Sequence, residues 1–142
     1  MRVLGIDVGA RRIGLAISDP SRTLARPLAT LHIAGASDAI DRVVEVLVRL
    51  QAEDDGLDTI VVGLPSRLDG TPTDATPAVV AFIDALKTRT MVPVTTEGER
   101  LTSHEADQRL AATERDWRKR KQALDAAAAA IILQDFLDRR QA

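Results

Sequence analysis

The chain has 142 residues, of which 45% are hydrophobic and 28% are charged, a length and composition typical of one soluble globular domain. The absence of cysteine excludes disulfide frameworks, thiolate metal sites and cysteine nucleophiles. Because we find no leader-like segment and no apolar segment of bilayer length, we expect a cytoplasmic protein without membrane association. The formal net charge of -2 argues against a wholly basic nucleic-acid-binding protein but leaves room for a local basic patch.

The first third of the chain predicts antiparallel strands. Two short apolar runs, Arg2–Val8 and Ile13–Ser18, are separated only by a turn that contains Gly9, which is typical of a β-hairpin. Residues 27–33 favour a third strand, and we expect it at a sheet edge because the amide of Pro27 cannot donate to a central ladder.

The rest of the chain predicts helices that alternate with strands. The first expected elements are a helix capped by Ser37 or Asp38 that ends at the acidic break 53–56, a strand over 59–63 and a loop over 64–77. A helix capped by Thr76 and a strand over 91–96 follow. The last expected elements are a short helix from Thr102, a basic connection and a long helix from about 122 to 140. Antiparallel strands followed by crossover units predict an α/β fold with a central mixed five-stranded sheet and helices on both faces.

Three acidic residues are candidates for a functional site. Asp7 ends the first strand, where it either contributes to a site or hydrogen-bonds the turn at Gly9. Glu99 comes after the last expected strand, at the edge where the carboxyl ends of parallel strands gather, unless it and Glu97 are solvated loop charges. Asp125 shares a helix face with apolar residues and is either a site residue or the helix N-cap. Clustered carboxylates repel one another unless cations join them, so such a cluster indicates Mg²⁺ or Mn²⁺ and phosphodiester hydrolysis.

One segment is strongly basic. Residues 115–121 carry five positive charges in seven residues beside the only tryptophan, Trp117. The segment is either a solvated helical turn or a strip that binds phosphates. His32 and His104 have no partner at metal-ligand spacing, so zinc is not expected.

Four spaced motifs extend over nearly the whole chain. They are Gly5-Ile6-Asp7-Val8-Gly9 with Arg12-Ile13-Gly14-Leu15-Ala16, Val61-Val62-Gly63-Leu64-Pro65 with Asp69-Gly70, Glu99-Arg100-Leu101-Thr102-Ser103 with Glu105-Ala106, and Asp125 before Ala127-Ala128 and Ile131-Ile132-Leu133-Gln134. In this order the motifs resemble the YqgF/RuvX family, the candidate pre-16S rRNA nucleases that are also described as Holliday-junction-resolvase-like. The resemblance implies a ribonuclease H-like fold in which residues 1–142 form one nuclease domain, and a cytoplasmic bacterial protein that trims the 5′ end of pre-16S rRNA in ribosome biogenesis.

The resemblance also implies roles for individual residues. Catalysis and the binding of Mg²⁺ or Mn²⁺ are assigned to Asp7, Glu99 and Asp125. Apart from the resemblance, we expect positively charged side chains near such a site to bind the nucleic acid, and the candidates are Arg12, Arg100, Arg115, Arg118, Lys119, Arg120 and Lys121.

One position departs from the family motif, which usually reads Asp-Glu-Arg where this chain has Gly98-Glu99-Arg100. Glu97 is then a candidate substitute for the missing carboxylate. If Gly98 has an ordinary backbone conformation, an aspartate there is expected to strengthen metal binding.

Other functions remain open at this point. The partner is nucleic acid, with pre-rRNA as the first choice and structured DNA such as a four-way junction as the second, and the protein is expected to be a monomer or a homodimer. A non-catalytic RNA-binding assembly factor is a further possibility. The Asp7-Val8-Gly9 turn also resembles the phosphate-binding turn of actin-like ATPases and sugar kinases, but those proteins need a second such domain.

Overall fold

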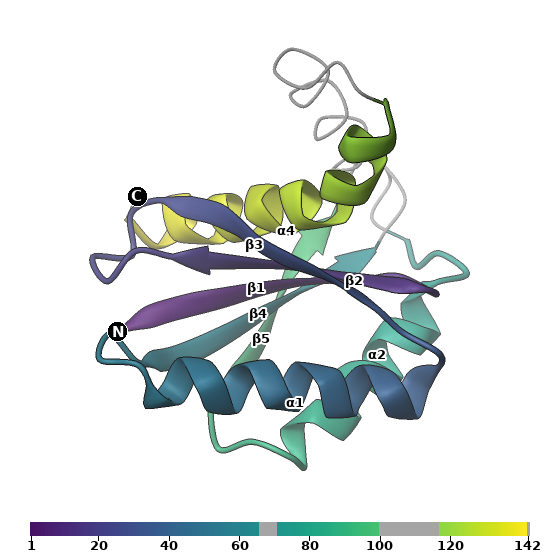
Figure 1. The fold of residues 1–142 in the computed structure, drawn as a ribbon, viewed down its shortest axis with the longest axis horizontal. Helices are drawn as coiled ribbons and strands as arrows, with labels where there is room; N and C mark the ends of the chain where they lie inside the picture. The colour runs from purple at the N-terminus through teal and green to yellow at the C-terminus, as the bar shows by residue number, and fades with distance from the viewer. Residues whose placement is uncertain (66–70, 100–116, 142) are drawn as a thin grey trace.

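The computed structural model describes residues 1–65, 71–99 and 117–141, with the backbone alone at residues 99, 117–123 and 141. The elements follow one another in the order β1 (Arg2–Val8), β2 (Arg12–Ser18), β3 (Ala25–His32), α1 (Ala36–Ala52), β4 (Leu57–Pro65), α2 (Thr76–Lys87), β5 (Val94–Glu99) and α4 (Trp117–Gln141). In Figure 1, α1 and α2 cover one face of the sheet and α4 covers the other.

The five strands form one mixed sheet in the order β3-β2-β1-β4-β5. β1 pairs antiparallel with β2, which pairs antiparallel with β3, whereas β4 is parallel to both β1 and β5. The predicted α/β class, the mixed five-stranded sheet and the helices on both faces are therefore confirmed. β3 is the predicted edge strand, and its register shifts where Pro27 stands opposite Ala16, as expected of a residue that cannot donate a ladder hydrogen bond.

Alternation along the strands divides the core into two layers. Leu4 and Ile6 of β1 are fully buried against the α1 and α2 side of the sheet. Val3 lies on the opposite face and packs under α4. The buried residues of this second layer are Val3, Ala16, Val61, Ala129, Ile132, Leu133, Phe136 and Leu137. Gly5 and Asp7 follow Val3 at intervals of two, so both belong to the face that α4 covers.

Two glycines allow α4 to lie very close to the sheet. A Cβ atom on Gly5 would lie 2.8 Å from the Cβ of Leu133. A Cβ atom on Gly14 would lie 1.9 Å from the carbonyl oxygen of Asp125, which leaves no room for any side chain. The helix backbone therefore touches β2 at Gly14, and this contact determines where Asp125 lies.

The predicted boundaries of the last strand and the last helix were wrong. The last strand is Val94–Glu99 and not 91–96, because the chain joins the ladder only after Pro93, with Val94 opposite Ile60. Consequently position 99 belongs to the sheet and not to a following loop. α4 begins at Trp117, so residues 117–121 are helical and are not a connection.

The predicted helix caps were also wrong. α1 has Gly35 at its N-cap with no side-chain cap, and Asp38 Oδ2 instead accepts a hydrogen bond from the amide of Ala34 at 2.8 Å. α2 begins at Thr76 itself, whose hydroxyl donates to the carbonyl of Pro65 at 2.8 Å. The predicted helix from Thr102 lies outside the described residues. Among the residues that are described, no helix has the length and apolar character needed to cross a membrane.

Candidate acidic site at the end of strand β1

Asp7 and Asp125 come to the same place on the sheet through Gly14. In the β1–β2 ladder Asp7 stands directly opposite Gly14. Gly14 in turn contacts the backbone of α4 at Asp125. Both acidic side chains are partly exposed. The structure therefore brings together two of the three predicted acidic positions, from segments more than a hundred residues apart.

Glu99 is the last residue of β5 and stands opposite Pro65 in the parallel ladder. Val61 faces α4 and pairs with Thr95. Residues at intervals of two share a face of a strand, so position 99 belongs to the α4 face, the face that also carries Asp7. Asp7 and Glu99 thus lie on the face of the sheet that α4 covers, and Asp125 lies on α4 itself. Asp7 and Glu99 are also near the carboxyl ends of parallel strands, where open α/β sheets bind ligands.

Asp125 does not cap a helix, because it lies more than two turns inside α4. Its Oδ2 atom lies 2.9 Å from Nε of Arg12, the first residue of β2. This oxygen is buried, and the contact with Arg12 lacks the geometry of a hydrogen bond. The pair is therefore an ion pair that leaves a buried carboxylate oxygen incompletely satisfied, a costly arrangement in the absence of a further ligand.

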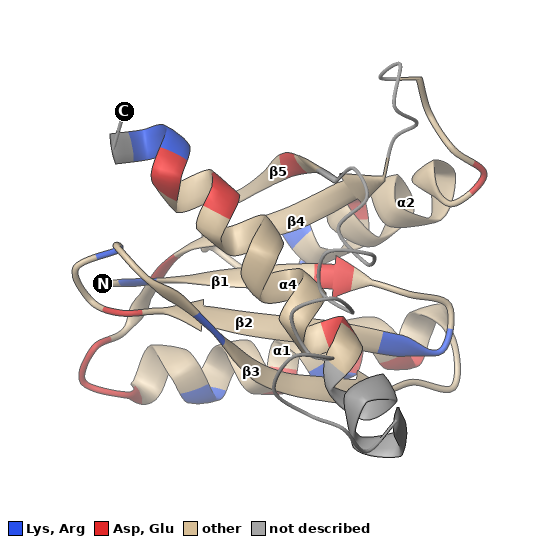
Figure 2. Ribbon diagram, turned by 90° about the horizontal axis from the view of Figure 1, so that it is seen from above, with Lys and Arg blue, Asp and Glu red and all other residues tan. Residues whose placement is uncertain are grey.

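A hollow of about 260 Å³ lies beside this ion pair. It is lined by Gly9, Ala10, Arg11, Arg12 and Asp125, and so it opens between the β1–β2 turn and α4. Figure 2 shows the acidic end of β1 beside an acidic turn of α4, with the basic β1–β2 turn next to it.

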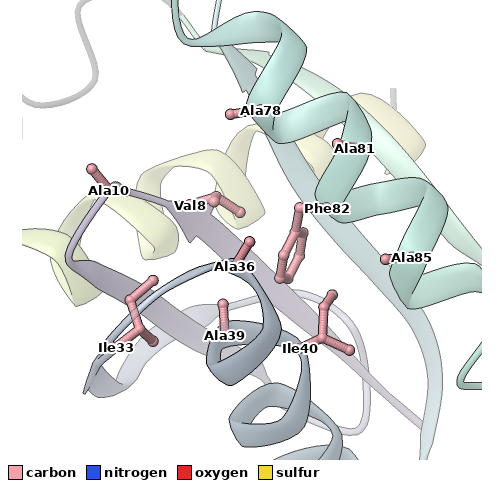
Figure 3. Close-up of a pocket in the computed structure, with 11 residues that line it drawn as sticks. Val8, Ala10, Ile33, Ala36, Ala39, Ile40, Ala78, Ala81, Phe82 and Ala85 are labelled. Carbon is pink, nitrogen blue, oxygen red and sulfur yellow. The ribbon is translucent and has the colours of Figure 1, made fainter.

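A second hollow, of about 300 Å³, lies on the other side of the same turn, between α1 and α2. Figure 3 shows its apolar lining, in which Phe82 and Ile40 face several alanines. None of its lining residues is charged. Metal ions and phosphates need charged or polar partners, so the hollow beside Asp125 is the candidate functional site.

Glu97 has a role that the sequence did not predict. It is only 6% exposed, and its Oε1 lies 2.9 Å from the guanidinium of Arg139 near the end of α4. Burial raises the pKa of Glu97 above its ordinary value, while the positive charge of Arg139 acts in the opposite direction. The interpretation of Glu97 as a solvated loop charge was therefore wrong. Glu97 Oε1 is buried without a hydrogen bond among the described residues, as Asp125 Oδ2 is, but its partner Arg139 lies 14 residues beyond Asp125 on α4, roughly 21 Å along the helix axis. Because Glu97 contacts that distant part of α4, it is not a ready substitute for the missing family aspartate.

Gly98 lies on the opposite face of β5 from positions 97 and 99. It pairs with Leu64, which packs against the core under α1 and α2. Its φ is not positive, and a Cβ atom there would meet nothing within 4 Å. Gly98 therefore has the ordinary backbone conformation that an aspartate could adopt. The aspartate side chain, however, would lie on the face of β5 away from Asp7.

We therefore expect Gly98→Asp to change little. The free energy of unfolding of this variant should stay within about 0.5 kcal/mol of the value for the parent protein, the usual range for a surface substitution. The Mn²⁺ concentration for half-maximal binding should be unaltered. Thermal melting and Mn²⁺ titration check both expectations, and a lower Mn²⁺ requirement would mean that a carboxylate at this position reaches the site around the end of the strand.

Residues 117–121 of the basic segment 115–121, which we call the basic tract, lie on the same helix as Asp125. Residues 117–121 form the first turns of α4, so positions 118–121 precede Asp125 by about 6 to 10 Å along the helix axis. Arg100 and Arg115 lie outside the described residues.

The donor set at the site is suited to a hard divalent cation. The described residues contain no cluster of three candidate ligand side chains, and the side chain of Glu99 is not among those described. Asp125 nevertheless offers a buried carboxylate oxygen without a hydrogen bond, and Asp7 lies on the same face. Carboxylate oxygens are the ligands that Mg²⁺ and Mn²⁺ prefer.

A five-stranded mixed sheet in the order β3-β2-β1-β4-β5, with helices on both faces, is the architecture expected of a ribonuclease H-like fold. The chain is similar to RuvC of T. thermophilus, solved in complex with a Holliday junction substrate, with a TM-score of 0.58 and 20% identity. The alignment covers 99% of this chain and 96% of that chain. This likeness shows the fold.

The particular family follows from the sequence comparisons. The model of the family described as RuvX, Holliday junction resolvase, matches residues 1–139. The chain is 41% identical over 139 residues to a protein of Chloroflexus aggregans, covering 98% of this chain and 94% of that protein. It is 34% identical over 141 residues to a protein of Desulforudis audaxviator, covering 99% and 96%. Both relatives are described as candidate pre-16S rRNA nucleases. The chain belongs to the RuvX family, a family of nucleases, and the resemblance found in the sequence motifs is confirmed.

Proposed function

We propose that the protein is a divalent-metal-dependent nuclease that hydrolyses phosphodiester bonds at the site formed by Asp7, Glu99 and Asp125. The observation that carries the proposal is the contact between Gly14 and α4, which places Asp125 beside the residue paired with Asp7. Membership in a nuclease family supports it. Residues 1–142 would act as one nuclease domain.

The residues of the chain have distinct tasks in this proposal. Asp7 and Asp125 hold Mg²⁺ or Mn²⁺ from β1 and α4, and Glu99 completes the ligand set from β5. When bound, the metal ions supply the Lewis acidity that activates the attacking water and stabilises the leaving oxygen. The close contact of α4 with β2 holds the two aspartates at a constant separation, so little rearrangement is needed when a substrate binds.

We infer that the substrate is RNA, and specifically the 5′ end of pre-16S rRNA, because the relatives that match almost the whole chain carry that description. An enzyme acting on rRNA would work in the cytoplasm. The description of the family as Holliday junction resolvases favours a second candidate, a nuclease acting on structured DNA.

A cleavage assay separates these functions. The purified chain is incubated with an RNA fragment spanning the 5′ end of pre-16S rRNA, with a duplex of the same length, and with a four-way DNA junction. Each substrate is tested with Mn²⁺ and with EDTA. The proposal predicts Mn²⁺-dependent cleavage of the RNA fragment. Cleavage of the junction alone would assign the chain to DNA, and binding of RNA without cleavage in Mn²⁺ would make it an assembly factor.

The basic tract is expected to bind the phosphate backbone without reading bases. Replacing Arg118, Lys119 and Arg120 by alanine should weaken binding to all RNA sequences alike. The slope of log affinity against log salt should fall by roughly 0.7–0.9 for each phosphate that the variant no longer binds. Fluorescence anisotropy at several salt concentrations measures both quantities.

The matched control removes three positive charges from the opposite side of the sheet. Arg49, Lys87 and Arg89 are exposed on or beside α1 and α2. Their replacement by alanine changes the net charge equally but should leave the slope nearly as it was. Equal slopes for the two triple variants would show that the tract is a solvated helix face.

A further inference from the structure

We propose that Arg12 is the counter-ion of Asp125 in the metal-free protein and that divalent metal must displace it, so that Arg12 lowers the metal affinity of the free site. The inference rests on the proposed function, since it concerns the same carboxylate. It assigns to Arg12 a task different from the phosphate binding that we expected from the sequence.

The first support is the state of the Asp125 carboxylate. Its Oδ2 atom is buried and is held only by Arg12 Nε at 2.9 Å, without a hydrogen bond among the described residues. A guanidinium normally binds a carboxylate through two aligned N–H groups. The contact here is therefore weaker than a bidentate pair, and a metal ion that binds this oxygen directly can replace it.

The second support is that the exchange needs only a side-chain rotation. The backbone of Arg12 is fixed, because its carbonyl accepts a hydrogen bond from the amide of Gly9 at 2.9 Å and the residue is paired with His32 of β3. The amide of Ile33 donates to the carbonyl of Arg11 at 2.9 Å, which ties the turn to the end of β3. The backbone of α4 is equally fixed against Gly14.

The third support is the space available to the displaced guanidinium. The Arg12 side chain is 34% exposed and lines the hollow of about 260 Å³ beside Asp125. It can swing out toward solvent without disturbing the core. The charge it leaves behind is then balanced by the metal ion, so the carboxylate is never left unpaired.

The test is calorimetric titration of the full chain with Mn²⁺, in the absence of nucleic acid. Arg12→Gln removes the guanidinium that the metal must displace. We expect this variant to bind Mn²⁺ at least about tenfold more tightly, because the attraction between opposite charges a few ångströms apart is worth more than a factor of ten at protein dielectric constants. Arg12→Met, a second uncharged variant, should show the same gain. Arg12→Lys keeps the charge and should stay close to the parent.

The matched control is Arg89→Gln, which removes an arginine from the exposed ion pair with Asp41, at 3.1 Å on the α1 and α2 side. Its Mn²⁺ affinity should equal that of the parent. Unchanged or weaker Mn²⁺ binding by both uncharged Arg12 variants, with melting temperatures near the parent, would overturn the inference and leave Arg12 as a support for Asp125.

A further variant separates this inference from the proposed function. Asp125→Asn removes the ligand charge and should greatly weaken Mn²⁺ binding. If it does not, the metal binds elsewhere and the proposed site fails, whatever the Arg12 variants do. If it does, and the uncharged Arg12 variants bind no more tightly, only the competition fails.

Discussion

Replacement of Asp7 by asparagine is expected to lower metal-dependent hydrolysis by more than about a hundredfold. Residues that only orient metal ligands already cost ten- to a hundredfold when they are removed, and Asp7 is proposed as a ligand itself. Asparagine has nearly the same volume, so the circular dichroism spectrum and the melting temperature should not change. Initial cleavage rates at saturating Mn²⁺ measure the effect.

The matched control is Asp58→Asn. Asp58 lies near the start of β4 in the same sheet, away from the carboxyl ends of the strands, and pairs with Arg22 at 3.0 Å. Its amide variant should keep the parent's cleavage rate. Full turnover by Asp7→Asn, or an equal loss in both variants, would place the chemistry elsewhere in the molecule.

Replacement of Gly14 by alanine is expected to destabilise the fold strongly. The new Cβ would lie 1.9 Å from the carbonyl oxygen of Asp125 and 2.2 Å from its carbon. Both are backbone atoms, so the whole helix would have to move. Overpacking a core by added methylene groups costs about 1–3 kcal/mol, and a clash with a helix backbone should reach at least the upper end, lowering the melting temperature by roughly 10 °C.

A second effect distinguishes this clash from a general loss of stability. Because Gly14 sets the position of Asp125, the alanine variant should also bind Mn²⁺ more weakly at temperatures where it is still folded. Gly98→Ala is the control, since a Cβ there meets nothing within 4 Å. Identical melting curves for the two alanine variants would contradict the close contact of α4 with β2.

The parts of the fold that sequence could predict are those decided locally. The β1–β2 hairpin follows from two apolar runs around a short turn, and α4 follows from its alanine-rich, helically spaced apolar residues. β5 was misplaced because Met91 and Val92 are apolar, whereas the true strand reads Val94-Thr95-Thr96-Glu97-Gly98-Glu99. That polar segment becomes a strand through its pairing with β4, a tertiary contact that overrides local preference.

The candidate site was predictable in its residue types but not in its ion pairs. The acidic positions could be proposed from strand ends and a helix face, and their catalytic roles stay a prediction. The pairs Arg12 with Asp125 and Glu97 with Arg139 join distant segments, and no spacing rule reveals them. Gly14 did carry a usable signal, because a glycine inside a strand often marks the close approach of another backbone.

The position of bound manganese decides between this site and any other. Crystals of the protein grown with Mn²⁺ give anomalous density that locates the ion independently of activity. The proposal predicts a peak in contact with the carboxylates of Asp7 and Asp125 on the α4 face, with the Arg12 guanidinium turned away from Asp125. Manganese found only at other carboxylates, with the Arg12 and Asp125 pair intact, would contradict it.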